Sequence, residues 1–215
     1  VAWVHHKVKP EKASSFTNEV FSLRLGATLC TPIGKSNANV TSLMNIINSN
    51  QIGNINVPVA VRFRSGFEQS QNLEEFSAEI VDAPQTISYN LLVCNDSAFQ
   101  GYQFLPNATR TISNETICHT NRFWDEAWNN NFLNNASFSA NRQSHLEYLV
   151  HAETRKSNGL SEEELVELLA NRENDFGYMS AILQSSKKTS TLAFLTQSYF
   201  GLGNLADDKK GLLPF

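Results

Sequence analysis

Residues 87–94 read Ile87-Ser88-Tyr89-Asn90-Leu91-Leu92-Val93-Cys94, and this stretch indicates the fold class of the chain most clearly. Its apolar residues Ile87, Tyr89, Leu91 and Val93 recur at every second position. Because side chains alternate between the two faces of a strand, this spacing places all four on one face. The stretch therefore predicts a β-strand with one face against a hydrophobic core.

The remainder of the first 120 residues gives a mixture of strand and helix signals. The segment from Val57 to Arg64 is rich in β-branched residues, and Pro58 near its start is typical of an edge strand. A further strand is predicted from Thr109 to Cys118. Apolar residues at helical spacing predict two short helices, from Lys12 to Leu25 and from Val40 to Asn48.

From Asn121 onward the apolar residues recur mostly at helical spacing. Trp124, Trp128 and Phe132 form an i, i+4, i+8 stripe that we expect to be buried. Ser161 and Glu164 have the spacing of a capping box and predict a helix whose buried side carries Leu165, Leu168 and Leu169. The other predicted helices are Arg142 to Lys156, Phe176 to Leu183 and Leu192 to Phe200.

Strand signals in one half and helix signals in the other are typical of the α+β class. We predict a strand-rich half, residues 1–120, packed on a helical half, residues 121–215, as one compact unit. A chain of 215 residues is long enough to bury a sizeable core without help from a metal.

The composition of the chain excludes some classes of function. The chain has 24 asparagines, a net charge of −4 and no basic stripe, which excludes a nucleic-acid-binding protein. No apolar run is long enough to predict a membrane span. The ends, Val1 and Phe215, resemble those of a processed polypeptide, so we expect a chain that has left the cytoplasm.

Five Asn-x-Ser/Thr sites occur, and their positions are more informative than their number. Random placement in a chain of this composition gives about four such sites, so the count alone is no sign of secretion. The surroundings of several sites are polar or turn-like, as acceptors of N-linked glycans require. We expect glycosylation among Asn39, Asn107, Asn114 and Asn135; Asn95, with Asp96 in the middle position, is the least favourable site.

The three cysteines allow two interpretations. Cys94 and Cys118 each end a predicted strand, and pairing of those strands would let them form a disulfide. Closing that loop would stabilise the fold by about 3–4 kcal/mol. The alternative is three reduced thiols. In the first case Cys30 is left without a partner within the chain.

Clusters of reactive residues give no complete catalytic or metal motif. His145 and His151 are six residues apart, too far for the two imidazoles of a zinc helix, and Glu147 with His151 reads as a surface pair. The carboxylates Asp125 and Glu126 lie between two indoles, as in some sugar-binding sites, but the core stripe explains the indoles better.

We therefore expect a secreted, non-catalytic glycoprotein that binds a hydrophobic small molecule or a partner subunit. The tail from Leu192 to Phe215 has apolar residues on more than one helical face, which favours a homo- or hetero-oligomer formed through the C-terminal helices. The alternative is a haem-thiolate oxidoreductase of the peroxidase or peroxygenase type, with Cys30 as axial ligand and Glu126 or Glu147 as the acid–base group.

Overall fold

The structure is a computed structural model of the whole chain. It describes residues 2–8, 18–24, 34–112, 120–131, 140–141, 143–148, 179–183, 191–196 and 211–214. The chain divides into two compact units, the first made mainly of Val1–Asn135 and the second mainly of Ala136–Gln184 and Lys188–Phe215. Each unit is described by itself below.

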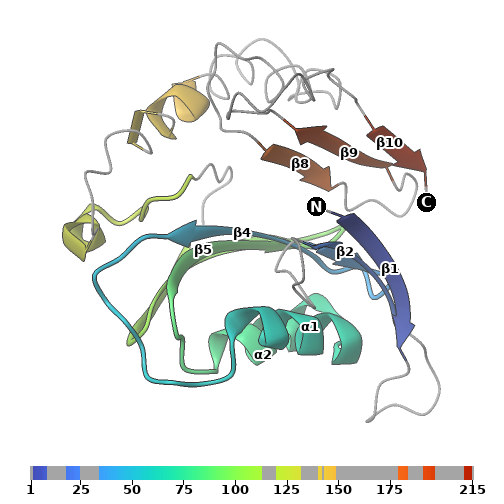
Figure 1. Ribbon diagram of the computed structural model, residues 1–215, viewed down its shortest axis with the longest axis horizontal. Helices are drawn as coiled ribbons and strands as arrows, with labels where there is room; N and C mark the ends of the chain where they lie inside the picture. The colour runs from blue at the N-terminus through green and yellow to red at the C-terminus, as the bar shows by residue number, and fades with distance from the viewer. Residues whose placement is uncertain are drawn as a thin grey trace. The chain divides into compact units, whose positions relative to one another are not determined.

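The first unit is built on a seven-stranded antiparallel sheet in which the spatial order follows the chain, from β1 to β7. Each strand therefore pairs with its sequence neighbour, and two helices lie in the connection between β4 and β5 (Figure 1). The strands are β1 (Ala2–Val8), β2 (Asn18–Arg24), β3 (Gly34–Ser36), β4 (Thr41–Ile47), β5 (Ser88–Cys94), β6 (Phe99–Leu105) and β7 (Ala108–Ile112). The fold is mixed α+β, as the sequence predicts.

The predicted strand at residues 87–94 is confirmed as β5, and it lies inside the sheet between β4 and β6. Tyr89, Leu91 and Val93 are fully buried on the face that the helices cover. Ser88 and Asn90, on the opposite face, are buried as well. The alternation thus places the core residues on one side of β5. The other side carries Ser88 and Asn90, and also Leu92 and Cys94, which are half-buried.

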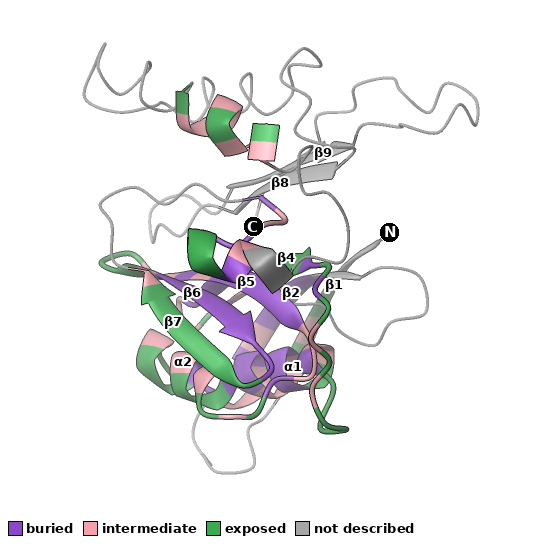
Figure 2. Ribbon diagram, turned by 90° about the vertical axis from the view of Figure 1, so that its left-hand side faces the viewer, coloured by how far each residue is buried: buried purple, intermediate pink, exposed green. Residues whose placement is uncertain are grey.

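Two short helices cover one face of the sheet (Figure 1). They are α1 (Val59–Gln69) and α2 (Leu73–Val81), and Figure 2 shows that their outer sides are exposed. Asn72 caps α2 by accepting a hydrogen bond from the backbone N–H of Glu75 at 2.9 Å. Gly66 allows the two helices to approach closely, because a Cβ there would lie 3.0 Å from the ring of Phe76.

The strand predicted from Val57 to Arg64 is wrong, because most of that segment forms α1. The buried positions Val59, Phe63 and Phe67 recur every four residues, which is helical spacing. Pro58 precedes the first turn, where the missing N–H of proline costs nothing. The β-branched composition of the segment was therefore a weaker signal than the spacing of its buried residues.

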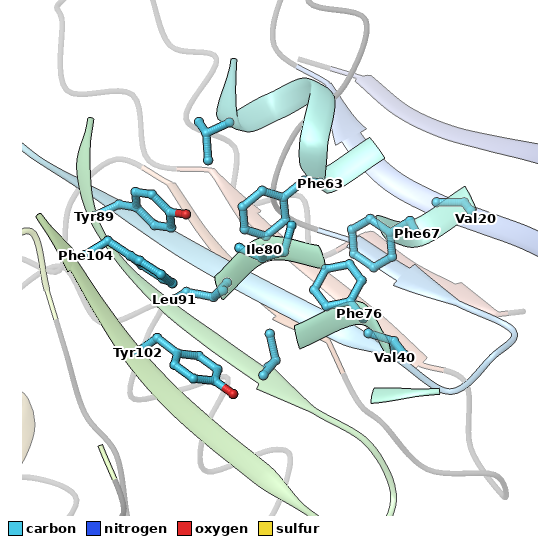
Figure 3. Close-up of a cluster of buried hydrophobic side chains, with 12 residues drawn as sticks. Val20, Val40, Phe63, Phe67, Phe76, Ile80, Tyr89, Leu91, Tyr102 and Phe104 are labelled. Atoms are coloured by element: carbon cyan, nitrogen blue, oxygen red, sulfur yellow. The ribbon is translucent and has the colours of Figure 1, made fainter. Parts of the chain in front are cut away.

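Between the helices and the sheet lies a core of aromatic rings (Figure 3). Phe63 of α1 meets Phe76 of α2 edge to face, with ring centroids 5.9 Å apart. On the sheet side, Tyr89 and Phe104 stack at 4.4 Å. Such pairs add to the free energy gained by burying the rings themselves.

Two predicted helices in the first unit are strands. The prediction from Lys12 to Leu25 overlaps β2, in which the alternating residues Asn18, Val20 and Ser22 are buried. The prediction from Val40 to Asn48 falls on β4, which pairs with β5 along its whole length. In both cases ladder hydrogen bonds and packing outweigh a local apolar pattern that also fits a helix.

The second face of the sheet is covered in part by residues 120–131. Asn90 Nδ2 donates to the backbone oxygens of Thr120 at 3.1 Å and Arg122 at 2.6 Å, while Gln103 Nε2 donates to Asn90 Oδ1 at 3.1 Å. The predicted stripe helix is instead a 3-10 helix, η1 (Glu126–Asn131). Within the stripe Trp128 is buried and Trp124 is half-buried; Phe132 lies outside the described residues.

The second unit contains a three-stranded antiparallel sheet in the order β10-β9-β8. Its strands are β8 (Met179–Leu183), β9 (Thr191–Thr196) and β10 (Gly211–Pro214). The helices predicted from Phe176 to Leu183 and from Leu192 to Phe200 are therefore wrong over β8 and β9. Residues 143–148, within the helix predicted from Arg142 to Lys156, are helical.

The remaining helical prediction, with Ser161 as cap, lies outside the described residues, as do Leu165, Leu168 and Leu169. Among the described residues, none of the helices has the length and hydropathy needed to cross a lipid bilayer. The division of the chain at residue 120 stays a prediction.

Candidate interaction surface

The connection from β4 to α1 exposes an unusual number of apolar side chains. In this segment, which we call the isoleucine loop (residues 51–58), Ile52 is 90% exposed and Ile55 is 105% exposed. Val57, and Val61 in the first turn of α1, are about half exposed. The sequence carries no charged residue from Gln51 to Val61. A surface of this kind is typical of a contact with a partner molecule.

The isoleucine loop is fixed to the body of the first unit at its C-terminal end by a buried arginine. Arg62 Nε and Nη2 each donate to the backbone oxygen of Val57 at 3.3 Å, and Nη2 also donates to the backbone oxygen of Pro84 at 2.5 Å. Arg62 is only 5% exposed, so its buried guanidinium joins the segments of Val57 and Pro84 inside the protein. Hydrogen bonds from a charged donor are stronger than those between neutral groups.

The other end of the loop is fixed by a close backbone approach. The N–H of Gly53 donates to the backbone oxygen of Thr86 at 3.3 Å. A Cβ at Gly53 would lie 2.2 Å from the backbone oxygen of Gln85, so no other residue fits without a shift. The N–H of Gln51 donates to Ser49 Oγ at 2.9 Å. These contacts hold the loop while leaving its isoleucines in solvent.

The segment against which the loop lies is itself supported from the core. Gln85 Nε2 donates to the backbone oxygens of Ile80 at 2.8 Å and Ala83 at 2.7 Å, and Tyr89 donates its hydroxyl proton to Gln85 Oε1 at 2.7 Å. Burial raises the pKa of Tyr89 well above its ordinary value, partly offset by the positive charge of Arg62. The phenol therefore remains a donor throughout the physiological pH range.

The isoleucine loop itself carries no acid, base or nucleophile beyond amides. Within the described ranges, no three His, Cys, Asp or Glu side chains are placed to hold a metal ion. The loop was not singled out from the sequence, because its apolar residues follow neither helical nor strand spacing. The signal present in the sequence is a pair of isoleucines, Ile52 and Ile55, in an uncharged segment that also contains Asn54 and Asn56.

Of the predicted glycan acceptors, Asn107 is placed best. It lies in the two-residue turn between β6 and β7, where Leu105 pairs with Ala108, and it is exposed together with Thr109, the hydroxyl residue of its site. Asn39 is half-buried in the turn between β3 and β4, with φ of 62° in the left-handed region. Its partner Thr41 is buried. Asn114 and Asn135 lie outside the described residues.

Asn95, the fifth site, has its side chain engaged in the turn between β5 and β6. Asn95 Oδ1 accepts hydrogen bonds from the backbone N–H groups of Ser97 at 2.9 Å and Ala98 at 2.8 Å. It also accepts from Ser97 Oγ at 3.1 Å. The residue is therefore a structural element of this turn.

The cysteine predictions are not tested by the structure. Cys94 is half-buried at the end of β5, whereas Cys30 and Cys118 lie outside the described residues. The Cys94–Cys118 disulfide and the role of Cys30 as a haem ligand both stay predictions.

The two carboxylates between the indoles lie in different surroundings. Asp125 makes an ion pair with Arg110 of β7, and the guanidinium of Arg110 lies 5.0 Å from the ring centroid of Trp128. Glu126 is exposed at the start of η1. In the second unit, Glu147 Oε1 accepts from Gln143 Nε2 at 2.6 Å, and His151 is not described.

A second group of charged residues, which the sequence did not indicate, lies where β1 meets α1. Glu68 Oε1 accepts from Arg64 Nε at 2.6 Å and lies 3.1 Å from His6 Nε2. Beside it, Asn18 Nδ2 contacts the backbone oxygens of Phe67, Glu68 and Ser70 at 3.0–3.1 Å. This group attaches the edge of the sheet to the end of α1, so its evident role is structural.

No protein-family model and no curated protein matches this chain. The functional argument therefore rests on the residues themselves.

Proposed function

We propose that this chain is a secreted, non-catalytic glycoprotein that binds a hydrophobic small molecule or a partner subunit, with the isoleucine loop as the contact. The observation that carries the proposal is the exposure of Ile52 and Ile55 on a loop that Arg62 and Gly53 hold in place. A loop without these anchors could turn its isoleucines inward. Here the anchors oppose that movement, and the apolar area stays available.

The two exposed isoleucines would supply part of the free energy of binding. Transfer of one isoleucine side chain from water to an apolar surrounding is favourable by about 1.5–3 kcal/mol. Two such side chains on a loop that is already ordered lose little conformational entropy on binding, which improves affinity. The proposal therefore requires no large rearrangement of the first unit.

Secretion is supported by the position of Asn107. A glycan on the exposed turn between β6 and β7 would extend into solvent and would not disturb the core. Asn39, Asn114 and Asn135 are further proposed acceptors, and the Cys94–Cys118 disulfide is proposed with them.

Assembly through the C-terminal region is a separate proposal. Because β9 is a strand, the contact there would be made by a sheet and not by the helices expected from the sequence. The packing of the two halves of the chain on each other also stays a proposal.

The test uses the full chain secreted by eukaryotic cells and analysed by native mass spectrometry, with and without Ile52→Ser and Ile55→Ser together. We expect the unchanged chain to carry a bound small molecule or a second polypeptide, and the double variant to lose it at an unchanged melting temperature. Phe99→Ser is the matched control, since Phe99 is also an exposed apolar residue of the first unit. An unchanged chain that carries nothing but glycans would contradict the proposal.

A further inference from the structure

The apex of the isoleucine loop is a single apolar side chain between two amides. The backbone bends at Ile55 and again at Val57, and Ile55 is as exposed as it would be in a free peptide. Asn54 and Asn56 on either side are exposed too. Asn56 Oδ1 accepts from the N–H of Val57 at 2.7 Å, which stiffens the second bend. One aliphatic group thus projects from a polar and ordered surrounding.

The backbone at the apex is open. Within the part of the chain that the structure describes, neither the N–H nor the C=O of Asn54 and Ile55 has a hydrogen-bond partner. Each polar group left unpaired in hydrocarbon costs several kcal/mol, more than burial of one isoleucine returns. Insertion of this apex into a lipid bilayer is therefore unfavourable. A protein surface can pair these groups while it buries Ile55.

Charged residues near the loop indicate what kind of partner surface would be complementary. The loop has no charge of its own. Asp82 is exposed two residues before Pro84, whose backbone oxygen Arg62 links to Val57 of the loop, and Glu79 is exposed about one turn further back, in α2. An acidic border repels anionic membranes. It also disfavours a second copy of this chain, whose net charge is −4. A partner with basic residues around its binding site would be complementary.

We propose that Ile55 is the anchor of a contact with a different protein, whose surface has an apolar pocket for one branched aliphatic side chain. The rim of that pocket pairs the amide of Asn54 and the open backbone groups beside it, and basic residues face Asp82 and Glu79. A buried apolar anchor inside a polar rim is the usual anatomy of a specific protein contact. This inference rests on the proposed function, in which the isoleucine loop binds.

Substitutions at Ile55 and Asn54 test the apolar contact and the polar contact beside it separately. Ile55→Asp should weaken binding by about a hundredfold or more, because a charge would enter an apolar pocket. Ile55→Val, which removes one methylene, should weaken it only about fourfold. Asn54→Ala should weaken it by about three- to tenfold through lost hydrogen bonds. Asn54 and Ile55 are both exposed, so these substitutions leave the core of the first unit unchanged.

The experiment places the photo-crosslinking amino acid p-benzoylphenylalanine at position 57 of the full chain, next to the anchor, and at position 99 as control. Irradiation is carried out in the medium into which the chain is secreted. Unlabelled full-length chains, either unchanged or carrying one of the three substitutions, then compete for adduct formation. In parallel, flotation with vesicles of phosphatidylcholine, with and without phosphatidylserine, tests binding to lipid.

The expected result is an adduct with one other polypeptide at position 57 and none at position 99. Competition should be strongest for the unchanged chain, intermediate for Ile55→Val and Asn54→Ala, and weakest for Ile55→Asp. If Ile55→Asp competed as well as the unchanged chain, the assignment of Ile55 as the anchor would be wrong. An adduct with a second copy of this chain, or flotation that depends on Ile55, would overturn the partner while leaving the loop as a binding surface. Absence of any adduct and of flotation would overturn the inference; the proposed function fails with it only if native mass spectrometry also finds nothing bound.

Discussion

Asn90 and Gln103 lie directly opposite each other on β5 and β6 and are joined by a buried hydrogen bond of 3.1 Å from Gln103 Nε2 to Asn90 Oδ1. Asn90 Nδ2 in turn donates to the backbone oxygens of Thr120 and Arg122. Gln103 Oε1 accepts a hydrogen bond from the backbone N–H of Asp125 at 3.1 Å. Two amide side chains thus hold a covering segment on the sheet, where apolar residues would be expected.

The first prediction concerns this amide pair. Asn90→Ala should lower the free energy of unfolding by about 3 kcal/mol, because it leaves buried carbonyl and amide groups without partners. Asn45→Ala is the matched control, since Asn45 lies opposite Asn90 on β4, is half-buried and has no side-chain hydrogen bond within the described residues. It should cost less than about 1 kcal/mol. Urea denaturation measures both, and equal losses would contradict the role of the amide pair.

The second prediction compares two glycines. Gly53→Ala should destabilise the first unit by about 1–3 kcal/mol and displace the isoleucine loop, because its Cβ would meet a backbone oxygen that cannot move alone. Gly66→Ala in α1 meets side chains alone, the ring of Phe76 at 3.0 Å and Ile80 Cδ1 at 3.7 Å, and gains helix propensity of about 1 kcal/mol. Thermal denaturation should show the larger loss at Gly53, and the reverse order would refute the anchoring of the loop.

The third prediction concerns Tyr89 at alkaline pH. Its pKa in the folded state is raised by burial, so the unfolded chain loses the phenolic proton first as the pH rises. Stability from this group is complete below the unfolded pKa of about 10 and then falls by about 1.4 kcal/mol per pH unit above it. Tyr89→Phe should be less stable at neutral pH, because Gln85 loses its donor. It should also have a flatter decline above pH 10, as denaturation across that range can show.

The fourth prediction concerns the glycan on the turn between β6 and β7. Chain secreted from eukaryotic cells should lose one glycan in intact mass on Asn107→Gln, and the same glycan on Thr109→Ala. Asn37→Gln, in a turn outside any acceptor site, is the control and should change the mass only by the substitution. A protein whose mass is unaltered by enzymatic deglycosylation would remove the support for secretion.

The fifth prediction concerns the thiols. Peptide mapping without reduction should find Cys94 linked to Cys118 and Cys30 outside any bridge within the chain. A link from Cys30 to either residue would rule out both the proposed pairing and the haem-thiolate alternative, since a bridged sulfur cannot bind iron as a thiolate.

The sequence predicts some elements of the first unit well and others poorly, for physical reasons. In β5 the alternation is strict and both faces are covered, so local pattern and packing agree. Val40, just before β4, and Leu43, Met44 and Ile47 within it also fit helical spacing. The pairing of β4 with β3 and β5 makes this segment a strand. At the start of α1 the conflict is reversed. The β-branched residues favour a strand, whereas the buried residues recur at helical spacing and the segment is a helix.

The exposed isoleucine loop was harder to predict than the fold. An isoleucine in the sequence normally indicates a buried position, and nothing in the composition of residues 51–58 shows that Arg62 and Gly53 hold them outward. The anchors involve residues 22 to 33 positions away along the chain, such as Pro84 and Thr86. Exposure of this kind depends on tertiary contacts that a local pattern does not encode.

The insertion of α1 and α2 between two neighbouring strands has a consequence for the order in which the chain can fold during its synthesis. β4 leaves the ribosome about 40 residues before β5, its pairing partner. At about 5–20 residues per second, β4 waits for several seconds with that edge unpaired. The nascent chain is then most exposed to wrong pairing, and a chaperone that binds it during this interval would act on the edge of β4.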